Sequence, residues 1–150
     1  AFFGAGVWGF LHTLHGVNYY THGTQITAAH GHLAFYGAYV CLNIAIFTYA
    51  MPILRGRDPY NQVLNMAAFW LMSGGMAFMT FTLTFAGTVQ THMQRVLGEN
   101  YMVVQDQLDI FYWMRFGSGV AVAIGVLMLI YALAFPRREV VSPEPTVAAE

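Results

Sequence analysis

Hydrophobic and polar residues are separated into long blocks along this chain. Four apolar blocks each approach or exceed the roughly 20 residues that an α-helix needs to cross about 30 Å of hydrocarbon. They run over Ala1–Tyr20, Ala28–Met51, Leu64–Val89 and Ile110–Phe135. The pattern predicts an all-α membrane protein with four transmembrane helices at these positions.

Composition supports this prediction. Of the 150 residues, 57% are hydrophobic and 9% are charged, whereas a soluble domain carries roughly 25% charged residues. Lysine is absent and the sequence shows no basic patch, which argues against nucleic acid as a partner. Cys41 is the single cysteine, so an intrachain disulfide is excluded, and we expect it to be a small buried hydrophobe. The chain begins with Ala1 inside an apolar block, and we expect it to be the C-terminal portion of a longer polytopic protein.

The arginines predict the orientation in the membrane. Short loops rich in arginine stay in the cytoplasm, which places Arg55 and Arg57, together with Arg137 and Arg138, on the inner side. The loop from Gln90 to Asp109 then lies outside, and His92 in it is expected to be a solvated surface residue. Residues 1–136 form the predicted transmembrane portion, and residues 137–150 a disordered cytoplasmic tail.

Two histidines at the start of the second block carry the main chemical hypothesis. His30 and His32 are two residues apart, so in a helix that turns by about 100° per residue they point about 200° away from each other. They cannot easily bind one metal, but they can bind two metals on opposite sides of one helix. Histidine is a standard axial ligand of heme iron, and Gly31 leaves room for the edge of a macrocycle. The alternative is a pair of polar residues hydrogen-bonded within a helix bundle.

Other polar residues in the apolar blocks have more ordinary interpretations. His12 and His15 are three residues apart and are expected on one face of the first helix, as a second metal site, a proton relay or polar groups near heme propionates. Thr27 is expected to cap the helix that carries the histidine pair. Arg115 either extends to the outer surface or pairs with an anionic group such as a heme propionate.

The third block is rich in methionine and threonine. Its methionines, from Met66 to Met79, are expected to serve packing or to face lipid. Its threonines are expected to hydrogen-bond to carbonyl groups of their own helix; they are Thr80, Thr82, Thr84 and Thr88.

Three stretches of the sequence carry a resemblance to a known family. HTLHGVNYYTHGTQITAAHGHLAFYGAYV, AMPILRG and QDQLDIFYWMRFGSG closely resemble the catalytic subunits of bacterial nitric oxide reductases, within the heme–copper oxidase superfamily. The resemblance implies that the chain is the last four helices of a fold of about twelve. It implies that His30 is the axial ligand of a high-spin heme b and that His32 is one axial ligand of a low-spin heme b. It also places Thr13 near the propionates of the high-spin heme, with a role in proton delivery.

The function implied by this resemblance is the reduction of two nitric oxide molecules to nitrous oxide and water. The non-heme iron of the family is bound by three histidines and a glutamate that lie outside this chain. The implied partners are the remaining helices of the same subunit, the lipid bilayer of a bacterial inner membrane, and a membrane-anchored cytochrome c subunit as electron donor.

Three alternatives remain open at this point. The first is an oxygen-reducing oxidase of the same superfamily, with copper opposite the high-spin heme. The second is a non-catalytic di-heme anchor that only transfers electrons. The third, a transporter or a bundle without cofactor, is disfavoured because no charged residue marks a substrate path.

Overall fold

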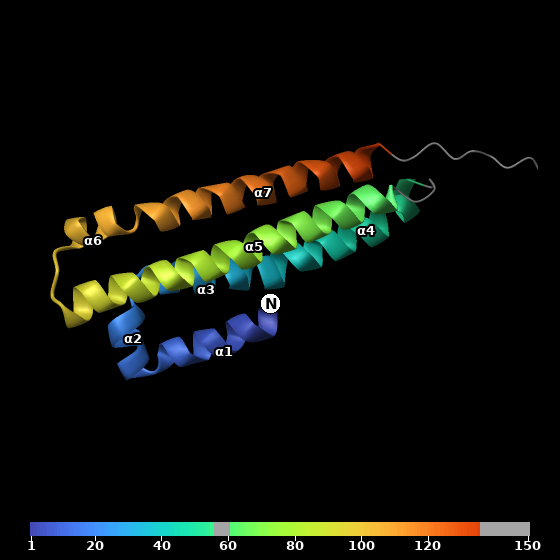
Figure 1. The fold of residues 1–150 in the computed structure, drawn as a ribbon. Coiled ribbons are helices and arrows are strands. Elements are labelled where there is room, and N and C mark those ends of the chain that lie inside the picture. Colours follow the sequence, from blue (N-terminus) through green and yellow to red (C-terminus); the bar gives the residue numbers. More distant parts are fainter. Residues whose placement is uncertain (56–60, 136–150) are drawn as a thin grey trace, which may run out of the picture.

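The computed structural model describes residues 1–55 and 61–135. Every regular element in these ranges is helical, and the long helices run side by side (Figure 1). The all-α prediction is therefore confirmed for this part of the chain. The predicted tail at 137–150, with Arg137 and Arg138, and the loop residue Arg57 lie outside the described residues.

Three helices in the described ranges are long and apolar enough to cross a membrane. The first joins α3 (Gln25–Phe35), the π-helical turn η1 (Tyr36–Val40) and α4 (Cys41–Arg55) into 31 residues. The second is α5 (Gln62–Thr91), which η2 (His92–Val96) extends to 35 residues. The third is α7 (Asp109–Ala134), with 26 residues. Three of the four predicted spans are thus present.

The first predicted span differs from the expectation. Residues Ala1–Tyr20 do not form one helix, because α1 (Phe2–Thr13) and α2 (His15–Thr21) are separated by Leu14 in an extended conformation. The Thr13 hydroxyl donates to the Phe10 carbonyl oxygen at 2.7 Å, and the Leu14 N–H bonds instead to Leu11 at 3.1 Å. The extended backbone of Leu14 therefore interrupts the helical hydrogen-bond pattern between α1 and α2. The fourth transmembrane helix is therefore not confirmed.

The connection between α5 and α7 is more helical than predicted. The expected loop from Gln90 to Asp109 is helical through Val96, and only residues 97–100 separate it from α6 (Tyr101–Gln107). Gly98 ends the first helix with a φ of 73°, a conformation that favours glycine. Asn100 caps α6 by accepting the Met102 N–H at 2.9 Å. His92 lies on the helical η2 rather than in a loop, and it is exposed as predicted.

The helix α5 is the centre of the packing, with α7 on one side and α3 on another (Figure 1). Its methionines Met72 and Met79 are buried, which confirms their predicted packing role. Three of its threonine hydroxyls donate to carbonyl oxygens one turn earlier, as predicted; they are Thr80, Thr84 and Thr88. Cys41 is a free, partly buried thiol that packs against the cluster around Met72.

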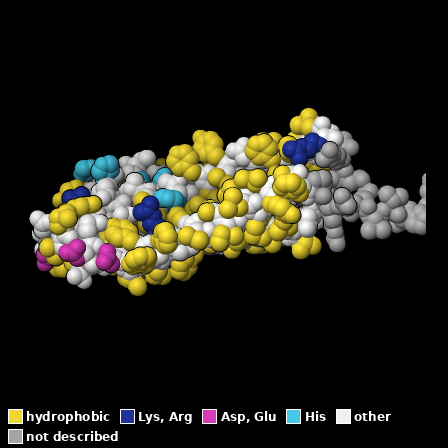
Figure 2. Space-filling view, turned by 90° about the horizontal axis from the view of Figure 1, so that it is seen from above, with side chains coloured by type: hydrophobic (Ala, Val, Ile, Leu, Met, Phe, Trp, Pro, Cys, Tyr) yellow, Lys and Arg dark blue, Asp and Glu magenta, His cyan; other side chains and the backbone are white. Residues whose placement is uncertain are grey.

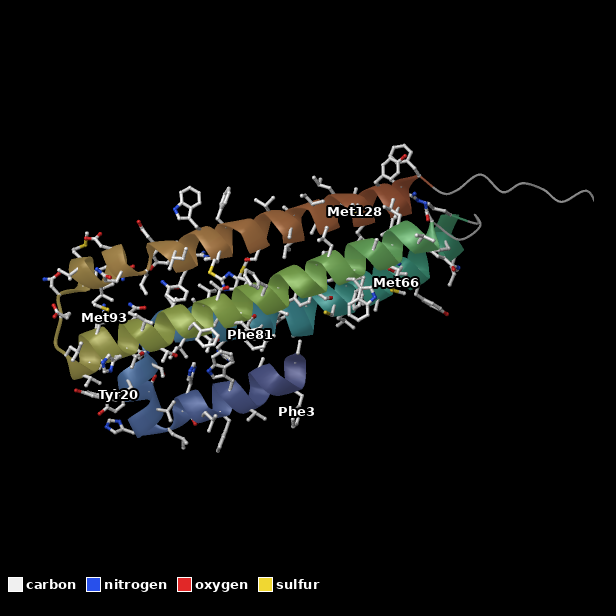
Figure 3. All side chains as sticks on the ribbon, viewed as in Figure 1. Phe3, Tyr20, Met66, Phe81, Met93 and Met128 are labelled. Carbon is white, nitrogen blue, oxygen red and sulfur yellow. The ribbon has the colours of Figure 1, made fainter. Side chains whose placement is uncertain are left out.

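The two ends of the bundle differ in charge. Arg55 at the end of α4 donates to the Leu133 carbonyl oxygen near the end of α7, at 3.1 Å, so these two helices end together. Acidic side chains gather at the opposite end, and hydrophobic ones cover most of the remaining surface (Figure 2). In the described part of the chain the acidic residues are Glu99, Asp106 and Asp109. Met66 and Met93 mark the two ends of the long helix, formed by α5 and η2, that connects these regions (Figure 3).

Candidate functional site

His30 and His32 face different sides of α3. His30 meets residues of α1, whereas His32 lines a cavity formed with α5 and α7. The divergence that their spacing predicted is present in the structure. Any group bound by one of these side chains is thus separated by α3 from a group bound by the other.

The His30 ring lies against α1. Its Nε2 is 3.1 Å from the Ala5 carbonyl oxygen, and its centroid is 5.3 Å from that of His12. A methyl group at Gly9 would lie 3.0 Å from Nε2, so the absence of a side chain there leaves room for the ring. An imidazole nitrogen bonds a carbonyl oxygen only as a donor, so Nε2 is the protonated nitrogen in this arrangement.

His12 and His15 do not share a face. His12 accepts the Trp8 indole N–H at 3.1 Å and packs edge-on against His30, whereas His15 is exposed on α2. The extended Leu14 separates the two helices, so the prediction of a common face was wrong. Thr13, between them, is exposed and donates to the Phe10 carbonyl oxygen.

The His32 ring faces away from α1. Its Nδ1 is 2.7 Å from the Ala28 carbonyl oxygen one turn earlier, so Nδ1 carries the proton and Nε2 keeps a lone pair. A backbone carbonyl that holds one ring nitrogen in this way is the usual support of a metal-binding histidine. His32 lines a cavity of about 550 Å³ together with Met79, Tyr112, Arg115, Phe116, Gly119, Val120 and Ala123. A second, almost wholly apolar cavity of about 370 Å³ also reaches His32, beside Gly31 and Tyr36.

The cavity beside His32 has one cationic side chain. Arg115 on α7 lines it, although the side chain as a whole is exposed. Arg115 and His32 come from helices far apart in the sequence, and the packing of α7 and α3 against α5 brings them to the same cavity. An anionic group beside His32 would therefore meet a positive charge.

Two local features position the start of α3. Thr24 caps the helix by accepting the Ile26 N–H at 3.3 Å, whereas Thr27 donates to the Thr21 carbonyl oxygen at 3.0 Å. The prediction that Thr27 is the cap was wrong, because the helix begins one turn earlier than the apolar block does. Gly87 allows α5 to approach the start of α3 closely, since a Cβ at position 87 would overlap the Ile26 backbone nitrogen.

A polar network that the sequence pattern did not reveal lies at the same end of α3. The Gln25 N–H donates to Gln90 Oε1 at 2.9 Å, and Gln25 Nε2 donates to the Tyr112 hydroxyl at 3.2 Å. The Tyr112 hydroxyl in turn donates to Gln105 Oε1. Gln90 is only 2% exposed, and a glutamine directly at the end of an apolar block was the one signal available in the sequence.

No group of three or more His, Cys, Asp or Glu side chains gathers within residues 1–55 and 61–135. Within that part of the chain, His30 and His32 therefore do not belong to a metal site built from three or more such side chains. A single imidazole is sufficient as one axial ligand of a heme iron, because the macrocycle itself supplies the in-plane ligands.

Membrane-length helices with an imidazole held beside an apolar cavity are typical of a membrane-embedded redox subunit. The chain belongs to the cytochrome c and quinol oxidase polypeptide I family, whose model matches residues 1–121. It is also similar to a nitric oxide reductase subunit of Stutzerimonas stutzeri, with 50% identity over 140 residues. The alignment covers 88% of this chain and 30% of that relative, so the chain spans less than a third of its relative's length.

Proposed function

We propose that this chain is part of a nitric oxide reductase catalytic subunit. Two nitric oxide molecules, two electrons and two protons would give nitrous oxide and water. The 50% identity to the nitric oxide reductase subunit of Stutzerimonas stutzeri, over most of the chain, supports this assignment. The observation that carries it in the structure is His32, whose Nδ1 is held by Ala28 beside a cavity of about 550 Å³.

His32 is the proposed axial ligand of a low-spin heme b. Its Nε2 keeps the lone pair that iron ligation requires, and the cavity volume lies within the roughly 300–1,000 Å³ typical of cofactor sites. Arg115 in the same cavity fits the negative charge of a propionate. A heme bound here would supply one-electron redox chemistry. The chain itself supplies the ligand nitrogen, an apolar wall and a compensating charge.

His30 is the proposed axial ligand of the high-spin heme b, and its surroundings fit a heme less well. Its Nε2 donates to the Ala5 carbonyl oxygen, and α1 occupies the adjacent space at Gly9. Ligation by Nε2 would require this hydrogen bond to be lost and α1 to move away from the ring. The proposal for His30 therefore rests on the sequence resemblance, and we derive no reaction step from its present geometry.

Thr13 is proposed to take part in proton delivery on the α1 side. Its hydroxyl is exposed and donates to the Phe10 carbonyl oxygen at 2.7 Å. A proton relay through Thr13 would require rotation of the hydroxyl away from that carbonyl, which a single torsion allows.

The proposed position in the membrane and the proposed partners depend on the orientation of the helices. The chain lies in a bacterial inner membrane with the remaining helices of its subunit, and the end at Arg55 and Leu133 faces the cytoplasm, with the C-terminus. The end with α6 and the acidic residues then faces the periplasm, where a membrane-anchored cytochrome c subunit would donate electrons. The non-heme iron would be held by histidines and a glutamate outside this chain.

The test is spectroscopy and metal analysis of the full-length protein. We expect a reduced-minus-oxidised spectrum with two hemes b, a carbon monoxide difference spectrum from one of them, and iron in excess of the two hemes. Two hemes that both fail to bind carbon monoxide would show an electron-transfer anchor instead and would refute the proposal.

Oxygen reduction is the second candidate function, because the family that matches this chain takes its name from cytochrome c and quinol oxidases. In that case the metal opposite the high-spin heme is copper. Metal analysis separates the two functions: one copper and no excess iron would favour the oxidase.

A further inference from the structure

Tyr112 belongs both to the polar network and to the cavity beside His32. Its hydroxyl accepts from Gln25 Nε2 and donates to Gln105 Oε1, while its ring lines the cavity. In this way Tyr112 on α7 connects the start of α3 with α6. Gln25 also donates its backbone N–H to the buried Gln90, so α5 is joined to the same network.

The network sits over one end of the cavity. Gln25 precedes His32 by seven residues, about two helical turns, so both lie on the same face of α3. Tyr112 precedes Arg115 and Phe116, which line the cavity further along α7. Of the four network side chains, Tyr112 is the one that lines the cavity, so the network holds in place the part of the cavity wall nearest to α6.

The network contains no alternative hydrogen-bond partner for the groups that Tyr112 bonds. The Tyr112 hydroxyl uses both its donor and an acceptor site. Gln105 Nε2 is buried without a partner, so Gln105 depends on Tyr112 for its only side-chain hydrogen bond in the described part of the chain. Loss of the hydroxyl would leave Gln25 Nε2 and Gln105 Oε1 unpaired, and buried amides in that state draw in water.

We propose that Tyr112 is a positioning residue that ties α3 to α6 and α7 and excludes water from the group bound at His32. This inference rests on the proposed function, because it concerns the low-spin heme assigned to His32. Removal of the tyrosine hydroxyl would loosen this part of the cavity wall and admit water beside the unpaired amides. Water stabilises the more charged, oxidised state of a heme, so its midpoint potential falls.

The test compares Tyr112→Phe with Tyr131→Phe in the full-length holoprotein. Tyr131 lies on the same helix, is 57% exposed and is not part of the network. Redox titration should show a more negative midpoint potential of the low-spin heme in Tyr112→Phe alone, with an unchanged carbon monoxide difference spectrum. Hydrogen–deuterium exchange should be faster in the peptide at the start of α3, because the Gln25 N–H bond to Gln90 is part of the same network.

If the Tyr112→Phe protein does not fold, a second variant tests the same proposal. Gln105→Leu removes the acceptor of the tyrosine hydroxyl and leaves the ring that lines the cavity, so we expect a smaller negative shift. An unchanged potential and unchanged exchange at full heme content would overturn the role of Tyr112. A His32→Ala protein that retains the low-spin heme would instead overturn the heme assignment on which the inference rests.

Discussion

Gly87 of α5 packs directly against the backbone nitrogen of Ile26, at the start of α3. A Cβ at position 87 would overlap that nitrogen and approach the Gln25 carbonyl carbon to 2.8 Å. The neighbour is backbone held by the Thr24 cap and by Gln90, so it cannot move aside as a flexible side chain would. This contact sets the distance between α5 and the helix that carries the histidine pair.

The first prediction concerns this contact. Gly87→Ala should destabilise the protein by about 1–3 kcal/mol, the usual cost of overpacking a close contact. Thermal unfolding in detergent checks it. Gly74→Ala is the matched control on the same helix, because nothing lies within 4 Å of a Cβ there. A Gly87→Ala protein as stable as the control would contradict the close approach.

The second prediction separates two threonines at the start of α3. Thr24→Ala removes the N-cap and should lower the free energy of unfolding by about 1 kcal/mol. Thr24→Ser keeps a capping hydroxyl and should retain most of that stability. Thr27→Ala removes only an exposed hydrogen bond to Thr21 and should stay within about 0.5 kcal/mol of the wild type. The free energy of unfolding measures both. Equal losses in the two alanine variants would argue against Thr24 as the cap.

The third prediction assigns the hemes. His32→Ala should remove the low-spin heme spectrum and leave the carbon monoxide signal, while His30→Ala should do the opposite. The two rings face different sides of α3, so we expect two separate losses, and the assignment of the high-spin heme to His30 rests on the sequence resemblance. His15→Ala, on the exposed face of α2, should leave both signals intact. Loss of the same heme in both variants would refute the assignment.

The fourth prediction concerns the charge of Arg115. Arg115→Gln should lower the midpoint potential of the low-spin heme by an amount on the order of tens of millivolts, because a nearby positive charge favours the reduced heme. Arg115→Lys keeps the charge and should keep most of the potential. Redox titration of both variants measures the shift. A potential that does not change in Arg115→Gln would show that the side chain only extends to the membrane surface.

Some differences between sequence and structure have a local cause. The apolar block Ala1–Tyr20 sums to a membrane span by composition alone, yet the backbone is extended at Leu14 and α1 ends there. Hydrophobic length does not register a break in the backbone at one residue. The same limitation put the cap of α3 at Thr27, because the helix starts with the polar Gln25 before the apolar block begins.

The order of residues was enough to predict the three membrane-length helices and the opposite directions of His30 and His32. Both follow from hydrophobic length and helical rotation, which depend only on residues close together in the chain. What each histidine faces became known only from the packed helices: α1 for His30, and the cavity with Arg115 for His32. The packing also joined Gln25 to Tyr112, 87 residues away. Such contacts depend on how the helices pack, and no local pattern in the sequence encodes that packing.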